Sequence, residues 1–185
     1  KYRLIIANTN KRRGLTDSKY NERRAECEKA VELLQPLREI SSLTDLQISD
    51  IPMFPKYIDN DVIRRRAKHV VTENARVLMA VDKLTKGDLL AFGELMNQSH
   101  DSLKDDYEVT GFELDTLVSE ARKFQGVIGS RMTGAGFGGC TVTLVESERA
   151  ELFMSIVGEN YKRITSLEPI FYLPEIGNGA SIASW

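Results

Sequence analysis

Apolar residues recur every three or four positions over several segments of the chain, the spacing that places them on one face of an α-helix. This pattern predicts helices over residues 16–35, 59–84, 89–103 and 112–124, with another around 152–157. Pro36 ends the first helix, and Lys86-Gly87-Asp88 supplies a break and a new N-cap between the second and the third. The second and third helices therefore predict an αα-hairpin.

Other segments have the composition of β-strands. Residues 2–9 are apolar and bounded by polar residues, which is typical of a strand buried on both faces. Strands are also expected at residues 127–128, 140–145 and 170–173. Residues 41–58 contain two prolines and predict irregular structure or short helical turns. A helical block followed by strand, strand, helix and strand predicts an α+β fold with helices beside an antiparallel or mixed sheet.

Composition and charge exclude several functional classes. The chain has 185 residues, of which 42% are hydrophobic, enough for one sizeable core or two small ones. With 27 acidic and 25 basic residues, the chain has no overall basic field, so we expect no nucleic-acid partner. Its apolar runs are too short to cross a bilayer, so we expect no membrane partner either. Two cysteines form neither a disulfide framework nor a zinc pattern, which predicts a cytoplasmic protein.

The densest group of glycines lies between the two strands predicted at 127–128 and 140–145. Gly134, Gly136 and Gly139 satisfy the G-x-G-x-x-G spacing, which lets backbone amides approach a phosphate or another loop. A dinucleotide-binding loop needs a helix directly after it, and here the β-branched run from Cys140 to Val145 follows instead. The Rossmann interpretation is therefore excluded.

Two other phosphate-binding patterns also fail. A protein-kinase glycine loop requires V-A-I-K, H-R-D and D-F-G segments downstream, and none follows Gly139. No Gly-Lys-Ser/Thr occurs, so the Walker A pattern is absent. The residues alone leave two interpretations open: a glycine-rich hairpin that permits close packing, or a loop that contacts phosphate.

The sequence of this segment nevertheless resembles a known family. Residues 129–142, GSRMTGAGFGGCTV, resemble the third, C-terminal motif of the GHMP small-molecule kinases in its galactokinase form. Further blocks resemble galactokinases in the same order, at residues 7–10 with 17–28, 66–74, 99–103 and 105–109. The resemblance implies a GHMP kinase C-terminal domain over residues 16–185, with a ferredoxin-like sheet flanked by helices. Residues 1–15 are then a strand and loop that continue from an N-terminal domain.

The family's galactose signature, ATP loop and catalytic M-D-Q segment occur nowhere in these residues, and the chain opens on Lys1 instead of Met. We therefore expect a C-terminal fragment of a galactokinase, with the N-terminal catalytic domain as its partner. The resemblance implies that the whole enzyme transfers the γ-phosphate of ATP to the C1 hydroxyl of galactose with Mg²⁺. The fragment would contain no catalytic residue and no metal ligand, bind neither ATP nor Mg²⁺ by itself, be inactive, and self-associate through uncovered apolar surface.

Two alternatives to a galactokinase remain: a non-catalytic galactokinase-like sensor of sugar and ATP, and an N-acetylgalactosamine kinase. The resemblance implies sugar contact for Tyr20, whose other interpretation is an aromatic residue packed within a helix stripe. It places Arg12 or Arg13 near nucleotide phosphates, without deciding between them. The resemblance also implies that the glycine motif supports the active-site cleft between the ATP loop and the sugar. The residues of this motif are Gly134, Ala135, Gly136, Phe137, Gly138 and Gly139.

Two further groups of residues carry predictions of their own. His69 and His100 lie on separate predicted helices without a companion carboxylate motif, so we expect structural roles and not a metal site. The run Arg64-Arg65-Arg66 falls on one helix, where consecutive residues point to different faces. It predicts a solvated surface and not a nucleic-acid patch.

Overall fold

The computed structural model describes residues 1–12, 16–175, 177 and 179. Six α-helices and four strands run along this part of the chain, with short 3₁₀ turns between them. The strands are β1 (Tyr2–Asn8), β2 (Val127–Thr133), β3 (Cys140–Glu146) and β4 (Ile170–Tyr172). The helices are α1 (Thr16–Leu34), α2 (Phe54–Tyr57), α3 (Asp61–Thr85), α4 (Leu89–Asp105), α5 (Phe112–Lys123) and α6 (Ala150–Thr165).

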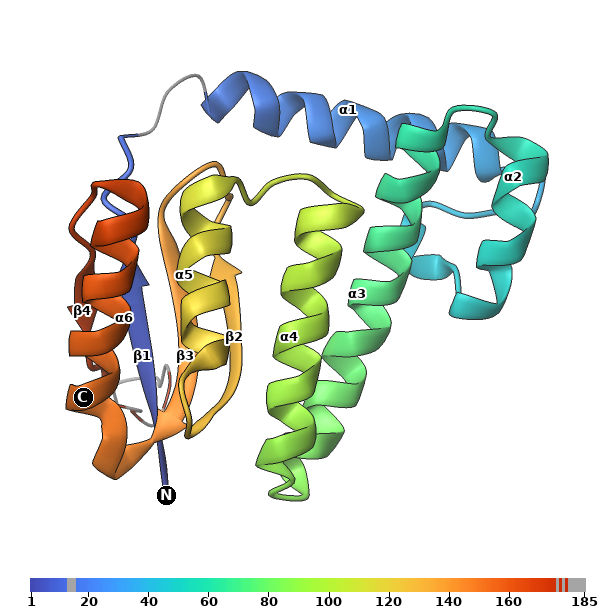
Figure 1. Ribbon diagram of the computed structural model, residues 1–185. Helices are drawn as coiled ribbons and strands as arrows, with labels where there is room; N and C mark the ends of the chain where they lie inside the picture. Colours follow the sequence, from blue (N-terminus) through green and yellow to red (C-terminus); the bar gives the residue numbers. More distant parts are fainter. Residues whose placement is uncertain (13–15, 176, 178, 180–185) are drawn as a thin grey trace, which may run out of the picture.

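The four strands form one antiparallel sheet in the order β2-β3-β1-β4 (Figure 1). This order, with a helical connection between β1 and β2 and another between β3 and β4, is the ferredoxin-like arrangement, as predicted. Helices α1 to α5 all lie within the first connection. The helical block is thus an expanded crossover of a small sheet.

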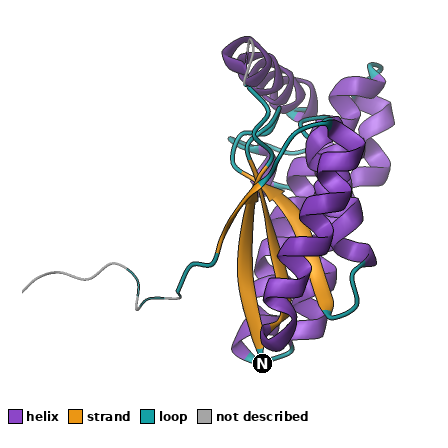
Figure 2. Ribbon diagram, turned by 60° about the vertical axis from the view of Figure 1, so that its left-hand side comes forward, coloured by secondary structure: helices purple, strands orange, loops and turns teal. Residues whose placement is uncertain are grey.

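Helices α5 and α6 cover one face of the sheet (Figures 1 and 2). Side chains alternate between the two faces of a strand, so Ile5 and Ala7 of β1 point into this core while Leu4 and Ile6 point to the other face. The buried helical residues that meet them are Leu117, Ala121, Phe153, Val157 and Tyr161. Burying each large apolar side chain contributes about 1.5–3 kcal/mol, which makes this cluster the main stabilising element of the sheet.

A second core lies among the helices away from the sheet. It joins α1, α2 and α3 to the short turns of residues 43–53, and its buried members include Leu34, Leu43, Phe54, Ile58 and Val71. The segment predicted as irregular or as short helical turns is therefore confirmed as two 3₁₀ turns and α2. Of the two arrangements expected, one core or two, the described residues form two larger cores, with a smaller cluster around Leu103, Val109, Leu114 and Met132.

The hairpin of α3 and α4 connects the helical core to the sheet, because α3 belongs to that core and α4 packs against β2. Asp88 caps α4 through the amide of Ala91, as the sequence predicted. At the contact with β2, Gly93 of α4 approaches the Ile128 carbonyl so closely that a Cβ atom would lie 2.2 Å from the oxygen. Backbone therefore packs directly on backbone where the helical block meets the sheet.

Strand β1 pairs with β3 and with β4 inside the sheet. The predicted domain boundary at residue 15 and the N-terminal domain before it stay predictions.

Among the residues that the structure describes, no helix is both long and apolar enough to cross a membrane.

Both histidines are buried, as expected for structural residues. The Nδ1 atom of His69 is hydrogen-bonded to the Ser102 hydroxyl (2.9 Å). The His69 ring also stacks on the Tyr107 ring, with ring centroids 4.4 Å apart. His100 accepts a hydrogen bond from the Met132 amide (3.2 Å) and so joins α4 to β2. Burial lowers the pKa of His69 to about 4, so this ring is neutral at neutral pH.

We expect His69 to make the protein less stable as the pH falls from about 6.5 towards 4. In that window the unfolded histidine takes up a proton and the folded one does not, so the free energy of unfolding decreases by up to about 1.4 kcal/mol per pH unit. Urea denaturation of the chain and of His69→Gln at several pH values measures this slope. The variant should have the shallower slope between pH 6.5 and 5, and parallel slopes would contradict the assignment.

Candidate functional site

The glycine segment forms the turn of the β2–β3 hairpin. Gly134, Gly136, Gly138 and Gly139 all have positive φ angles, and so does Phe137 between them (φ 58°). Residues with a Cβ atom rarely adopt this backbone conformation, which accounts for the glycines. The strand directly after the turn confirms the exclusion of a dinucleotide-binding loop.

The turn rests on the segment between α4 and α5. The amide of Phe137 donates a hydrogen bond to the Val109 carbonyl (2.7 Å), and a Cβ atom on Gly136 would lie 2.1 Å from the same oxygen. On its other side, the Thr9 amide donates to the Gly139 carbonyl (2.9 Å). The turn is therefore held between the end of β1 and the segment after α4.

Tyr20 faces this turn from the first part of α1. One cavity of about 160 Å³ is lined by residues from α1, the segment after α4 and the turn, among them Tyr20, Tyr107, Val109, Gly134, Ala135 and Phe137. Tyr20 is 57% exposed, so its side chain is accessible and is not packed within a helix stripe. The structure thus brings Tyr20 and the glycine segment to one place, while their binding roles stay predictions.

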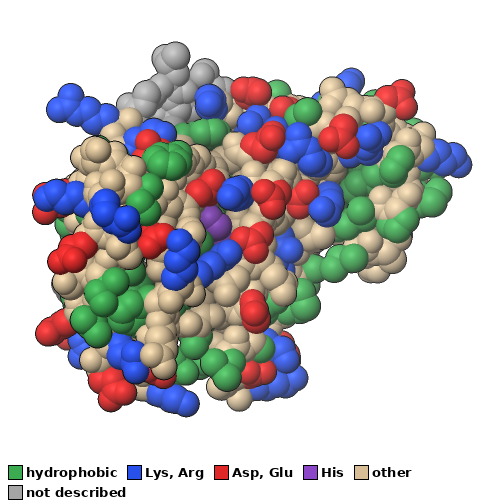
Figure 3. Space-filling view, in the orientation of Figure 1, with side chains coloured by type: hydrophobic (Ala, Val, Ile, Leu, Met, Phe, Trp, Pro, Cys, Tyr) green, Lys and Arg blue, Asp and Glu red, His purple; other side chains and the backbone are tan. Residues whose placement is uncertain are grey.

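The basic loop after β1 passes the same turn. Lys11 lies against Gly138 and forms an ion pair with Glu113 at the start of α5 (2.7 Å). Arg12 is exposed on this loop, and Arg13 lies outside the described residues. Figure 3 shows Lys and Arg side chains interspersed with Asp and Glu over the visible face, so no basic patch dominates that face.

The prediction that Arg64-Arg65-Arg66 forms a solvated surface is wrong for Arg66. Its side chain is only 2% exposed and binds Glu26 of α1 (2.8 Å) and Glu108 after α4 (2.5 Å). Hydrogen bonds from Arg66 and Arg65 hold the pKa of Glu108 below its usual value. Arg66 is therefore a buried member of an ion-pair network that joins α1, α3 and the segment after α4.

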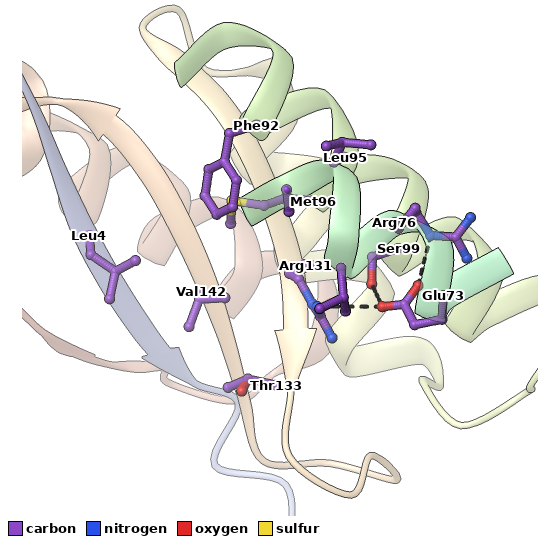
Figure 4. A pocket seen from close by; sticks show the side chains of 12 residues that line it. Leu4, Glu73, Arg76, Phe92, Leu95, Met96, Ser99, Arg131, Thr133 and Val142 are labelled. Atoms are coloured by element: carbon purple, nitrogen blue, oxygen red, sulfur yellow. Dashed lines mark hydrogen bonds and ion pairs between the residues drawn. The ribbon is translucent and has the colours of Figure 1, made fainter. Parts of the chain in front are cut away.

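A larger cavity, of about 290 Å³, lies between the other face of the sheet and helices α3 and α4 (Figure 4). Its apolar wall includes Leu4, Phe92 and Val142. At its polar end, Glu73 pairs with Arg76 (2.7 Å), accepts a hydrogen bond from Ser99 and lies 3.6 Å from Arg131.

Burial of Glu73 opposes its ionisation, but the bonds from Ser99 and Arg76 outweigh this and lower its pKa. No motif in the sequence pointed to this group, whose members come from α3, α4 and β2. Among the described residues, no cluster of three or more His, Cys, Asp or Glu side chains could hold a metal ion.

Comparison with known proteins identifies relatives of the chain. Residues 80–163 match the family model of the GHMP kinases C terminal. The chain is 53% identical over 179 residues to a galactokinase of Clostridium acetobutylicum and 52% identical over 178 residues to one of Fusobacterium nucleatum. These alignments cover 97% and 96% of this chain but only 46% of each relative. The chain thus spans about half the length of these curated relatives.

Solved structures show the same similarity. A crystal structure of Lactococcus lactis galactokinase complexed with galactose superimposes with a TM-score of 0.93 at 46% identity, over 97% of this chain and 46% of that chain. L. major mevalonate kinase in complex with R-mevalonate superimposes with a TM-score of 0.58 at 18% identity, over 96% of this chain and 44% of that one. The second likeness concerns the fold alone, and together the comparisons confirm the family resemblance seen in the sequence motifs.

We expect Gly136→Ala to destabilise the chain more than Gly134→Ala does. Both glycines have nearly the same φ, 83° and 86°, so both variants have a similar backbone strain. Only the Gly136 methyl group would meet the Val109 carbonyl, whereas nothing lies within 4 Å of a Cβ atom on Gly134. Overpacking of this kind costs about 1–3 kcal/mol, which urea denaturation of the two variants measures. Equal losses would contradict the close approach.

Proposed function

We propose that the chain is the C-terminal half of a cytoplasmic galactokinase and carries a GHMP kinase C-terminal domain. The observation that carries the proposal is the sequence identity of 53% and 52% to two galactokinases, over 97% and 96% of this chain. A relative of 46% identity has been crystallised with galactose. The whole protein would transfer the γ-phosphate of ATP to the C1 hydroxyl of galactose and release galactose 1-phosphate.

In this proposal the chain supplies one wall of the sugar site. Tyr20 would lie against galactose, and the glycine turn would support the cleft in which the sugar and the ATP phosphates meet. Arg12 or Arg13 would approach the phosphates. Phosphoryl transfer depends mainly on positioning the reactants and stabilising charge, so a rigid wall contributes to the rate without a reacting group of its own.

The catalytic base and the metal site are assigned to an N-terminal domain. Mg²⁺ in kinases is held by one or two carboxylates together with the substrate phosphates, and the proposal assigns no residue of this chain to it. No step performed by this chain passes through the metal. By itself the chain would therefore bind neither ATP nor Mg²⁺ productively and would be inactive.

The apolar side chains on the second half of α3 support an N-terminal partner domain. Val77, Leu78, Val81 and Leu84 continue the apolar stripe of the helix, yet they are 47–66% exposed. Leu90, at the start of α4 in the same hairpin, is also exposed (64%). An apolar surface of this kind is typical of an interface, so the isolated chain would also self-associate.

The activity can be tested with the full-length protein and with this chain alone. The full-length protein should convert galactose and ATP with Mg²⁺ to galactose 1-phosphate, detected by ³¹P NMR, and this chain alone should form no product above background. A substrate panel that includes N-acetylgalactosamine distinguishes the related sugar kinase. Binding of galactose and ATP without turnover would replace the proposal with the sugar and ATP sensor.

We expect Tyr20→Ala in the full-length protein to raise the KM for galactose about tenfold, the equivalent of about 1.4 kcal/mol of lost contact. The free energy of unfolding should change little, because Tyr20 is 57% exposed. Tyr172→Ala serves as a matched control, since Tyr172 is a similarly exposed tyrosine (49%) on the edge strand β4. Equal galactose KM values for the two variants would remove Tyr20 from the site.

A further inference from the structure

Three arginines hold the segment of residues 105–109 that connects α4 towards α5. Arg23 comes from α1, while Arg65 and Arg66 come from α3. Together they donate to the carbonyls of Asp105 (2.8 Å), Asp106 (2.7 Å), Tyr107 (2.8 Å) and Glu108 (3.4 Å). Four consecutive backbone carbonyls, from the last residue of α4 into the irregular segment after it, thus accept hydrogen bonds from arginine side chains.

Arg66 is the central member of this arrangement. Its guanidinium binds the carbonyl of Asp106 and the carboxylates of Glu26 and Glu108 in three separate directions. Glu26 in turn binds Arg23 (3.0 Å), so the network joins α1, α3 and the segment after α4. A buried charge is tolerated only when it is well paired, and these contacts meet that condition.

The held segment has an unusual backbone. Glu108 has a φ of 54°, in the left-handed region that residues with a side chain rarely adopt. Such a conformation persists only where the surroundings fix it, and here the surroundings are Arg65 and Arg66 on the side chain of Glu108 and Arg23 on its carbonyl. The next residue, Val109, carries the carbonyl that receives the glycine turn.

The same network reaches α1, the helix that carries Tyr20. Arg23 follows Tyr20 by three positions on α1, which places both side chains on the same side of the helix. Both also line the cavity shared with Val109 and the glycine turn. Arg66 therefore connects to both walls of that cavity. Through Glu26 it reaches α1, which carries Tyr20, and through Glu108 it reaches Val109, which holds the glycine turn.

We infer that Arg66 is a positioning residue that fixes the distance between Tyr20 and the glycine turn. The consequence for sugar binding rests on the proposed function, whereas the consequence for the turn does not. Lysine could not replace Arg66, because a single ammonium group on a flexible stem does not present donors in three fixed directions. Arg66 touches neither Tyr20 nor the turn, so its effect is transmitted through the segment at 105–109 and through α1.

The experiment compares Arg66→Met with Arg64→Met in the full-length protein. Arg64 belongs to the same arginine run, but it donates to the carbonyls of Ile58 (2.9 Å) and Asp59 (3.1 Å), away from the segment at 105–109. The two readouts are steady-state kinetics with galactose and ATP, and amide hydrogen exchange over residues 134–139. Arg66→Met should raise the KM for galactose about tenfold, change kcat less than about threefold, and speed exchange in the turn. Arg64→Met should change neither readout.

The two readouts separate this inference from the proposed function. If the unmodified full-length protein does not phosphorylate galactose, the proposed function fails and exchange in the turn alone decides the inference. Unchanged exchange in Arg66→Met overturns the inference, and faster exchange with an unchanged galactose KM overturns its sugar part.

If Arg66→Met does not fold, Glu108→Gln replaces it, because Glu108 is 45% exposed and this change weakens the bonds to Arg66 and Arg65. It should produce the same changes, smaller in size, and their absence again overturns the inference.

Discussion

The backbone contact between Gly136 and the Val109 carbonyl is the constraint on which the arrangement of the site depends. It joins the hairpin of the sheet to the segment that leaves the helical block, and it leaves no room for a side chain. A second contact of the same kind, between Gly93 and the carbonyl of Ile128, joins α4 to β2. Because protein interiors are close-packed and deform little, these two contacts fix where the helical block stands relative to the sheet.

Charge placement complements these contacts. A buried ion pair adds little net stability, because desolvation of the charges offsets their attraction, but removing one partner is costly. The buried Arg66 network is therefore better understood as a device for geometry than as a source of stability. It holds an irregular segment that is also anchored by two apolar contacts, the stack of Tyr107 on His69 and the burial of Val109. A site that works by positioning reactants needs this kind of rigidity at its walls.

Much of the fold follows from the hydrophobic pattern, because α3 and α4 are long and amphipathic and the glycine segment separates two β-branched runs. Arg66 shows where the prediction failed. It stands three residues after Ile63 and four before Val70, within the apolar stripe of α3, and the consecutive arginines concealed that spacing. The exposed Val77 and Val81 show the opposite limit: periodicity reveals which face is apolar but not what covers it. The cavity that Tyr20 and the glycine turn both line brings together residues more than a hundred positions apart, which local patterns do not encode.

The central claim is that Tyr20 and the glycine turn form one wall of a galactose site. Amide hydrogen exchange of the full-length protein, with and without galactose, tests it most directly. Galactose should slow exchange in residues 19–24 of α1 and in residues 134–139 of the turn. Protection by galactose that leaves both of these segments unchanged would contradict it.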